Sequence, residues 1–250
     1  MISYRYHSRT EISTQDIGKA LPVMADDAGM EVVYTFCQQQ GRGQKGNVWF
    51  DGQDSNICAT FVFAPRFLNA VHLFFLDMAL SIGVLRYAES QTDCVFLKWP
   101  NDLYVGQKKL AGLLLESSIQ AGKVERLCFG VGLNVNQREF PVHLPHAVSL
   151  LQTDGKLRNL QEEVRKLAKF LYATYAEFRN SYAKGIWRKW KERYLEHLLF
   201  KDQWREFLYL GEPLAACIRN VDDYGHLELE RRNGSRIRAD LKELEYRFDG

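Results

Sequence analysis

The sequence predicts an α/β (α+β) protein in which a mixed, largely antiparallel sheet with helices precedes a small, barrel-like β domain. Strand-like segments alternate with long segments of helical apolar spacing up to about residue 200. Beyond that point only short strand-like segments remain, separated by turn residues such as the Asn233-Gly234 pair. A chain of 250 residues with 46% hydrophobic content can bury a large core. We therefore expect one domain over residues 1–200 and a second over residues 201–250.

The N-terminal part of the chain is expected to form strands and two helices. The first helix should begin after Ser13, which can cap it, and Asp16 completes a pattern typical of a capping box. Residues 68–89 carry apolar side chains at helical spacing and should form a long, mostly buried helix. Strands rich in alternating, β-branched or aromatic residues are expected at residues 2–7, 31–38 and 56–64.

The elements that follow are mainly strands joined by tight turns, one of them at residues 121–123. Helices are expected at residues 160–182 and 186–198, interrupted at Gly185. The short segments after residue 200 have the spacing of strands in a small barrel. Strands are expected at residues 95–97, 103–105, 110–119, 124–135, 204–208, 214–221, 227–231 and 236–239.

Composition excludes several classes of protein. A net charge of +2 gives no electrostatic basis for nucleic-acid binding. The five cysteines lie far apart in apolar segments, without metal-ligand spacing, and should be buried free thiols of a reducing cytoplasm. No signal segment is present at the N-terminus, and no uninterrupted apolar run approaches membrane-spanning length. We expect a soluble cytoplasmic protein without DNA or membrane partners.

The most informative segment is residues 98–116. Lys98 ends an apolar run, Pro100 then interrupts regular pairing, and Asn101, Asp102 and Lys109 follow around one turn. Two cations, an amide and a carboxylate are thus gathered within a dozen residues. A solvated hairpin would explain any one of these charges, but the whole string indicates a site for chemistry.

Residues 38–49 form a glycine-rich segment with a literal G-x-G-x-x-G pattern at Gly41, Gly43 and Gly46. No helix opens after it and no Gly-Lys-Ser/Thr closes it, so neither a dinucleotide fold nor a Walker loop is predicted. A mobile cationic loop with open backbone amides suits a polyanion. An exposed turn with two incidental cations explains this segment almost as well. Trp49, at the end of this segment, could stack on a flat ring of a ligand, although tryptophans more commonly pack in the core.

Residues 129–136 contain two glycines that alternate along a strand. Such glycines usually mark a close approach to the backbone, at Gly130 and Gly132 here. Asn134 follows them with an amide that can bond a heterocycle edge. For this segment alone, a β-bulge with a turn asparagine is the better interpretation.

Together these segments resemble the biotin–protein ligase family. The shared pattern, in order, is a Ser-Thr pair at a helix start, Gly-Arg-Gly-x-x-Gly, Lys-Trp-Pro-Asn-Asp, Lys-Leu-Ala-Gly and Gly-x-Gly-x-Asn. It covers residues 2–136 strongly, and Lys-Trp-Pro-Asn-Asp with Lys-Leu-Ala-Gly is its specific part. The resemblance implies a class II synthetase-like catalytic domain followed by an SH3-like β-barrel.

The activity implied by this resemblance is that of a biotin–[acetyl-CoA-carboxylase] ligase. Biotin and ATP, with Mg²⁺, would form biotinyl-5′-AMP and pyrophosphate. The ε-amine of a lysine on a biotin carboxyl carrier domain would then take the biotinyl group and release AMP. The first step joins two anions, so cations must offset their repulsion.

The resemblance also implies roles for individual residues. Asp102 would hold Mg²⁺ or orient the incoming amine, and both alternatives stay open. The catalytic residues would be Lys98, Arg42 and Asp102. Biotin would be bound by Ser13, Thr14, Gln15, Gln38, Arg42, Gly43, Gln44, Lys98 and Gly112. ATP and the adenylate would be bound by Arg42, Lys45, Trp49, Asn101, Lys109 and Asn134.

Three departures from the family pattern matter. Gln15 stands where the family usually has Asn, and Gln44-Lys45 replaces the common Arg-Arg. With one cation fewer in the loop, we expect weaker retention of the adenylate. The chain begins almost directly at the catalytic region, so we expect no DNA-binding repressor domain. Association into a homodimer through a sheet edge is possible.

Three alternative functions remain. A lipoate or octanoate–protein ligase would lack the Lys-Trp-Pro-Asn-Asp and Lys-Leu-Ala-Gly pair. A non-catalytic sensor of biotin or adenylate is suggested only by Gln44. A nucleic-acid-binding module would use the arginines of the β tail, but nearby carboxylates favour a solvated hairpin there. The arginines are Arg231, Arg232, Arg236 and Arg238, and the carboxylates are Asp240, Glu243 and Glu245.

Overall fold

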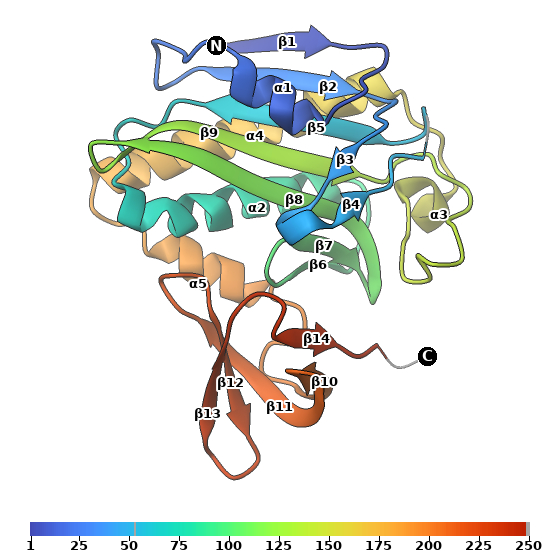
Figure 1. Cartoon of the computed structure of the whole chain (residues 1–250), viewed down its shortest axis with the longest axis vertical. Helices are drawn as coiled ribbons and strands as arrows, with labels where there is room; N and C mark the ends of the chain where they lie inside the picture. The colour runs from blue at the N-terminus through green and yellow to red at the C-terminus, as the bar shows by residue number, and fades with distance from the viewer. Residues whose placement is uncertain (53, 249–250) are drawn as a thin grey trace.

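The computed structural model describes residues 1–52 and 54–248, except for the side chain of Lys45. Its centre is a seven-stranded sheet in which only β1 and β2 pair in parallel (Figure 1). The predicted mixed, largely antiparallel sheet is therefore confirmed. In spatial order its strands are β1 (Ile2–Tyr6), β2 (Met30–Thr35), β5 (Ile57–Phe63), β9 (Lys123–Leu133), β8 (Lys108–Gln120), β7 (Asp102–Val105) and β6 (Val95–Lys98).

Helices cover both faces of this sheet. In Figure 1, α1 (Thr14–Ala20) lies in front of the sheet and α4 (Leu160–Ala183) passes behind it. Every residue of β2 and β5 is buried as a result, and most of them are apolar. The long helix α2 (Leu73–Glu89) packs against α4 and α5 (Lys189–Glu196), so most of its surface lies in the core.

The segment at residues 70–89, a 3₁₀ turn followed by α2, is long and apolar enough by length and composition to cross a membrane, although Asp77 and Arg86 interrupt the apolar run. Most of its apolar window, 61%, is buried inside the fold. The core helix of a globular protein meets the same criteria of length and composition. Packing against α4 and the sheet accounts for its apolar character.

The C-terminal residues form a separate five-stranded antiparallel sheet, which lies below the large sheet in Figure 1. This small β-barrel-like unit agrees with the prediction, although its last strand is too short to have been recognised. In spatial order its strands are β13 (Arg236–Ala239), β12 (Leu227–Arg231), β11 (Glu212–Val221), β10 (Trp204–Tyr209) and β14 (Leu244–Tyr246).

Several local predictions are corrected. The glycine-rich segment is a hairpin of β3 (Gly41–Arg42) and β4 (Val48–Trp49) around a 3₁₀ turn at Gln44–Gly46. The short helix α3 (Leu150–Asp154) was not predicted, although Ser149 and Gln152 form a complete capping box there. Helix α5 begins three residues later than expected.

At the start of α1, Ser13 accepts from the backbone of Gln15, as an N-cap should. Asp16 does not complete a capping box, because its carboxylate pairs with Arg42. The cysteines are free as expected, but Cys94 is exposed and Cys37 only partly buried.

Candidate active site

A cavity lies on one face of the large sheet, over β8 and β9, bordered by α1, the β3–β4 hairpin and the β6–β7 turn. It gathers side chains from distant parts of the sequence because β5, β9 and β8 are neighbours in the sheet. Among the residues selected from the sequence whose side chains the structure describes, all except Asn134 line it. These lining residues are Ser13, Thr14, Gln15, Gln38, Arg42, Gly43, Gln44, Trp49, Lys98, Asn101, Asp102, Lys109 and Gly112.

One part of the cavity carries neutral polar side chains, and we call Thr14, Gln15, Gln38 and Thr60 its neutral end. The backbone N–H of Thr14 donates to the Gln38 side-chain oxygen (2.8 Å), and the Thr60 hydroxyl donates to that of Thr14 (3.0 Å). Gln15 is only 2% exposed and donates to the Cys128 carbonyl (3.0 Å). Because these groups bond one another and the backbone, they are held in fixed orientations.

Two glycines of β9 leave space for side chains that lie against the strand. A Cβ atom at Gly130 would lie 2.8 Å from Gln15 Oε1, and one at Gly132 would lie 2.3 Å from Trp49 Cε2. Gly112, opposite Gly132 on β8, leaves space for the same indole. The prediction of a close approach to the backbone is thus confirmed, and the approaching groups are Gln15 and Trp49.

A second part of the cavity, the charged end, consists of Lys98, Asp102 and Lys109. Antiparallel pairing of β6 with β7 places Lys98 opposite Asp102. The Asp102 carboxylate lies 2.6 Å from Lys109 Nζ and 3.8 Å from Lys98 Nζ. The Lys98 ammonium also lies 4.4 Å from the centroid of the Tyr246 ring, which is within cation–π range. The charges that the sequence placed around one turn therefore meet in space.

Burial of Lys98 lowers its pKa below the ordinary value for lysine. The charge of Lys109 lowers this pKa further, whereas the Asp102 carboxylate opposes the shift. The Lys98 side chain is only 15% exposed. Two ammonium groups beside one carboxylate leave excess positive charge in a poorly hydrated place, which an anionic ligand would offset.

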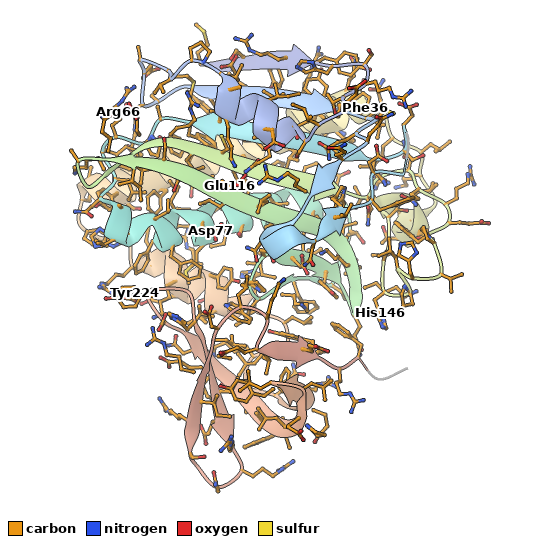
Figure 2. All side chains as sticks on the ribbon, viewed as in Figure 1. Phe36, Arg66, Asp77, Glu116, His146 and Tyr224 are labelled. Carbon is orange, nitrogen blue, oxygen red and sulfur yellow. The ribbon has the colours of Figure 1, made fainter. Side chains whose placement is uncertain are left out.

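Arg42 lies at the edge of the cavity and pairs with two carboxylates, Asp16 on α1 and Glu116 on β8 (3.0 Å). Glu116, labelled in Figure 2, also pairs with Lys19 of α1. These contacts tie the glycine-rich hairpin to the sheet and the helix. The Arg42 side chain is 42% exposed, so its ion pairs contribute only about 0–1 kcal/mol each. Its guanidinium can therefore exchange them for an anionic ligand at low cost.

Two asparagines selected from the sequence bond the backbone. Asn134 is 3% exposed and lies outside the cavity lining, where its Nδ2 donates to the Val148 carbonyl (3.1 Å). This bond anchors the segment before α3 to the end of β9, and a contact of Asn134 with adenine stays a prediction. Asn101 does line the cavity, but its Nδ2 donates to the Leu113 carbonyl and fixes the turn on β8. The side chain of Lys45 lies outside the described residues.

Sequence reasoning missed several lining residues. Thr60 is a polar residue inside the otherwise apolar, fully buried strand β5, and that position was the available signal. Leu241 and Lys242 reach the cavity from the C-terminal sheet. Nothing in the sequence connects these two residues with a site more than a hundred positions away.

The residues present fit a Mg²⁺ ion only in part. Asp102 offers one carboxylate, which two lysines already contact. Within the described part of the chain no cluster of three or more His, Cys, Asp or Glu side chains could hold a metal. Mg²⁺ often binds through one carboxylate together with substrate phosphates, and this arrangement is the one that the cavity permits.

Residues 25–134 match the model of the biotin/lipoate A/B protein ligase family. This part of the chain therefore carries a domain of that family. Over 198 residues it is 32% identical to the bifunctional ligase/repressor BirA of Salmonella typhimurium, covering 78% of this chain and 60% of that relative. It is 29% identical to the biotin–[acetyl-CoA-carboxylase] ligase of Paracoccus denitrificans over 130 residues, or 51% of this chain and 52% of that protein. The chain thus spans about 60% of the length of the BirA relatives.

Solved structures of family members have the same fold. The biotin protein ligase of Aquifex aeolicus, in complex with biotin and ATP, matches with a TM-score of 0.76 and 24% identity, covering 97% of each chain. The biotin acetyl coenzyme A carboxylase synthetase of Helicobacter pylori, with bound biotinylated ATP, matches with a TM-score of 0.56 and 17% identity, covering 96% of this chain and all of that one. The large sheet and the small C-terminal sheet are therefore both part of the family architecture.

Proposed function

We propose that this chain is an ATP-dependent, AMP-forming biotin–protein ligase that acts on a lysine of a biotin carboxyl carrier domain. The observation that carries this proposal is the presence, within one cavity, of a neutral hydrogen-bonding end and a charged end with two lysines. The first end suits an uncharged polar ring such as the ureido group of biotin. The second suits the meeting of a carboxylate with a nucleotide phosphate. The names of the relatives, which are biotin ligases, support the same assignment.

In the first step, a carboxylate oxygen of biotin would attack the α-phosphorus of ATP, and the bond to the β-phosphate would break. Pyrophosphate leaves with the electron pair. Lys98, which is buried and beside Asp102, would contact the carboxylate and the phosphoryl oxygens, and Lys109 would neutralise phosphate charge. Arg42 would exchange Asp16 and Glu116 for the ligand and shield the mixed anhydride from water.

In the second step, the neutral ε-amine of the acceptor lysine would attack the biotinyl carbonyl carbon. The bond from that carbon to the phosphate oxygen breaks and AMP leaves, while the amine loses a proton. Asp102 is the carboxylate of the charged end that could orient the amine, and with the ATP phosphates it could also hold Mg²⁺, whose charge would assist the first step. We also propose that residues 1–200 and 201–250 fold as two domains of one cytoplasmic enzyme.

The test is transfer of labelled biotin to a purified carrier domain with ATP and Mg²⁺. We expect transfer by the wild type and a loss of roughly 10²–10³-fold for Lys98→Ala, the range typical for removal of a principal charge-stabilising group. Lys108→Ala is the matched control, because Lys108 is an exposed lysine at the start of β8, next to Lys109, and does not line the cavity.

The same assay with lipoate in place of biotin distinguishes the nearest alternative. Transfer of lipoate in preference to biotin would replace the proposed substrate. Binding of biotin by a folded wild type that transfers nothing would indicate a sensor.

A further inference from the structure

The C-terminal sheet forms part of the cavity wall. Leu241 and Lys242, in the turn between β13 and β14, line the cavity together with residues of the large sheet. Tyr246 of β14 places its ring 4.4 Å from the Lys98 ammonium. A second tie lies nearby, where the indole N–H of Trp99 donates to the Gly225 carbonyl (2.8 Å). The small sheet is therefore held against the segment that carries Lys98.

The turn that carries Lys242 is fixed by hydrogen bonds on both sides. The Asp240 carboxylate accepts from the backbone N–H of Leu241 (2.6 Å), and the Glu243 carboxylate accepts from that of Asp240 (2.8 Å). The Glu243 carbonyl accepts from Leu210 of the adjacent β10–β11 turn (2.7 Å). Lys242 is therefore presented by a defined turn.

Lys242 has a backbone conformation that is unfavourable for its residue type. Its φ angle is 73°, in the left-handed region where glycine is the residue without a steric penalty. Glycine occupies many other positive-φ positions in this chain, including Gly211 and Gly234 of the same sheet. A lysine in such a conformation, at a position that lines a cavity, points to a use for the side chain.

The charges around the cavity indicate what that use is. Four of the charged side chains that line it are cationic, and the single anionic one is Asp102, among the residues that the structure describes. Arg42, Lys98 and Lys109 come from the large sheet and its hairpin, and Lys242 adds a cation from the C-terminal sheet. Such an excess of positive charge attracts a polyanion, and phosphate oxygens are suitable acceptors for ammonium groups.

We propose that Lys242 is a nucleotide-binding residue, which the C-terminal sheet contributes to the cavity and which contacts the β- and γ-phosphate oxygens of ATP. The proposal rests on the ligase function given above and assigns the small sheet a direct part in binding its nucleotide. Lys242 would hold the phosphates that leave as pyrophosphate. Its contribution therefore appears in the binding of ATP and is absent from the binding of biotin.

The test compares Lys242→Gly with Leu210→Gly. Leu210 has the same kind of conformation, with φ of 52°, lies in the adjacent turn and does not line the cavity. Both substitutions relieve backbone strain, so both should leave the melting temperature unchanged or raised. We expect Lys242→Gly to weaken binding of a non-hydrolysable ATP analogue about tenfold, as loss of one charged contact would. Leu210→Gly should bind as the wild type does.

Calorimetric titrations with biotin and with AMP complete the test. Lys242→Gly should bind both within about twofold of the wild type, and Lys242→Arg should recover most of the affinity for the ATP analogue. Unchanged binding of the ATP analogue by Lys242→Gly would overturn the proposal, and so would an equal loss for AMP. A wild type that binds ATP but transfers no biotin contradicts the ligase function alone, because the tenfold difference in nucleotide binding would still support Lys242.

Discussion

The two ends of the cavity differ in how their polar groups affect the stability of the free protein. At the neutral end, the polar groups of Thr14, Gln15 and Thr60 already bond one another or the backbone, so they stabilise the fold before any ligand arrives. At the charged end, Lys98 and Lys109 share one carboxylate, and Lys98 is largely buried. Excess buried charge lowers the stability of the free protein, and only an anionic ligand offsets it. The neutral end is thus suited to recognition and the charged end to chemistry.

The largest expected effect separates stability from activity at the charged end. Lys98→Met should lower the rate of adenylate formation by roughly 10²–10³-fold while it raises the melting temperature by roughly 2–4 °C. The second effect follows because a methionine of similar volume removes a buried charge and leaves Asp102 paired with Lys109. Pyrophosphate release and thermal unfolding measure the two effects. If Lys98→Met is less stable than the wild type, the inference that Lys98 lowers the free energy of unfolding is contradicted.

The pH dependence of stability gives an independent check on Lys98. Its pKa in the folded state is lowered from the usual 10.5, so over the range just below 10.5 the unfolded state binds more protons than the folded state. The contribution of Lys98 to the free energy of unfolding should therefore rise with pH in that range. The difference between the melting temperatures of Lys98→Met and the wild type should shrink accordingly, and a widening difference would show the opposite shift.

A pair of glycine substitutions on β9 tests whether the two ends act separately. Gly132→Ala would bring a Cβ to 2.3 Å from the Trp49 indole and displace it, whereas Gly130→Ala would press on the Gln15 carboxamide at 2.8 Å. We expect at least about a tenfold loss of ATP affinity in the first variant and of biotin affinity in the second. Each variant serves as the control for the other in binding titrations. If both variants lose affinity for ATP and for biotin to the same extent, the two ends are coupled and do not act separately.

A smaller effect is expected at Tyr246, whose ring lies beside the Lys98 ammonium. Tyr246→Leu should slow adenylate formation about tenfold, since a cation–π contact in a desolvated site is worth up to about 2 kcal/mol. Tyr246→Phe keeps the ring and removes a buried hydroxyl that lacks a hydrogen-bond partner among the described residues. It should therefore keep the rate and should not reduce stability. If Tyr246→Phe slows adenylate formation as much as Tyr246→Leu does, the effect belongs to the hydroxyl and not to the ring.

The smallest expected effect concerns retention of the intermediate. Gln44 lies in the 3₁₀ turn of the hairpin and lines the cavity. Gln44→Arg should slow release of biotinyl-AMP by a few-fold, about 1 kcal/mol, because a cation would be added at an exposed edge. Release is measured by dilution of preformed labelled complex, with Gln40→Arg, outside this cavity lining, as the control. Equal rates in wild type and Gln44→Arg would show that the loop charge does not limit retention.

Much of the charged end was predictable because it is local. Lys98 and Asp102 face each other through one hairpin, and Lys109 follows on the next strand, so turn chemistry and alternation suffice to group them. The surroundings of Asn134 were not predictable in this way. Its Nδ2 donates to the carbonyl of Val148, which lies 14 positions further along the chain and needs a donor. A mobile glycine-rich loop was expected at residues 41–47, whereas pairing of β3 with β4 orders that segment.

The sequence by itself determined the strands, the long helices and the residue types that carry the chemistry, because periodicity, caps and turns act over a few positions. Only the tertiary structure decided which distant groups share the cavity. Gln15 bonds a carbonyl 113 positions away, Trp99 bonds one 126 positions away, and Lys242 joins a site built by the other sheet. Such contacts depend on how the whole core packs. Burial of apolar surface drives that packing without regard to distance along the chain.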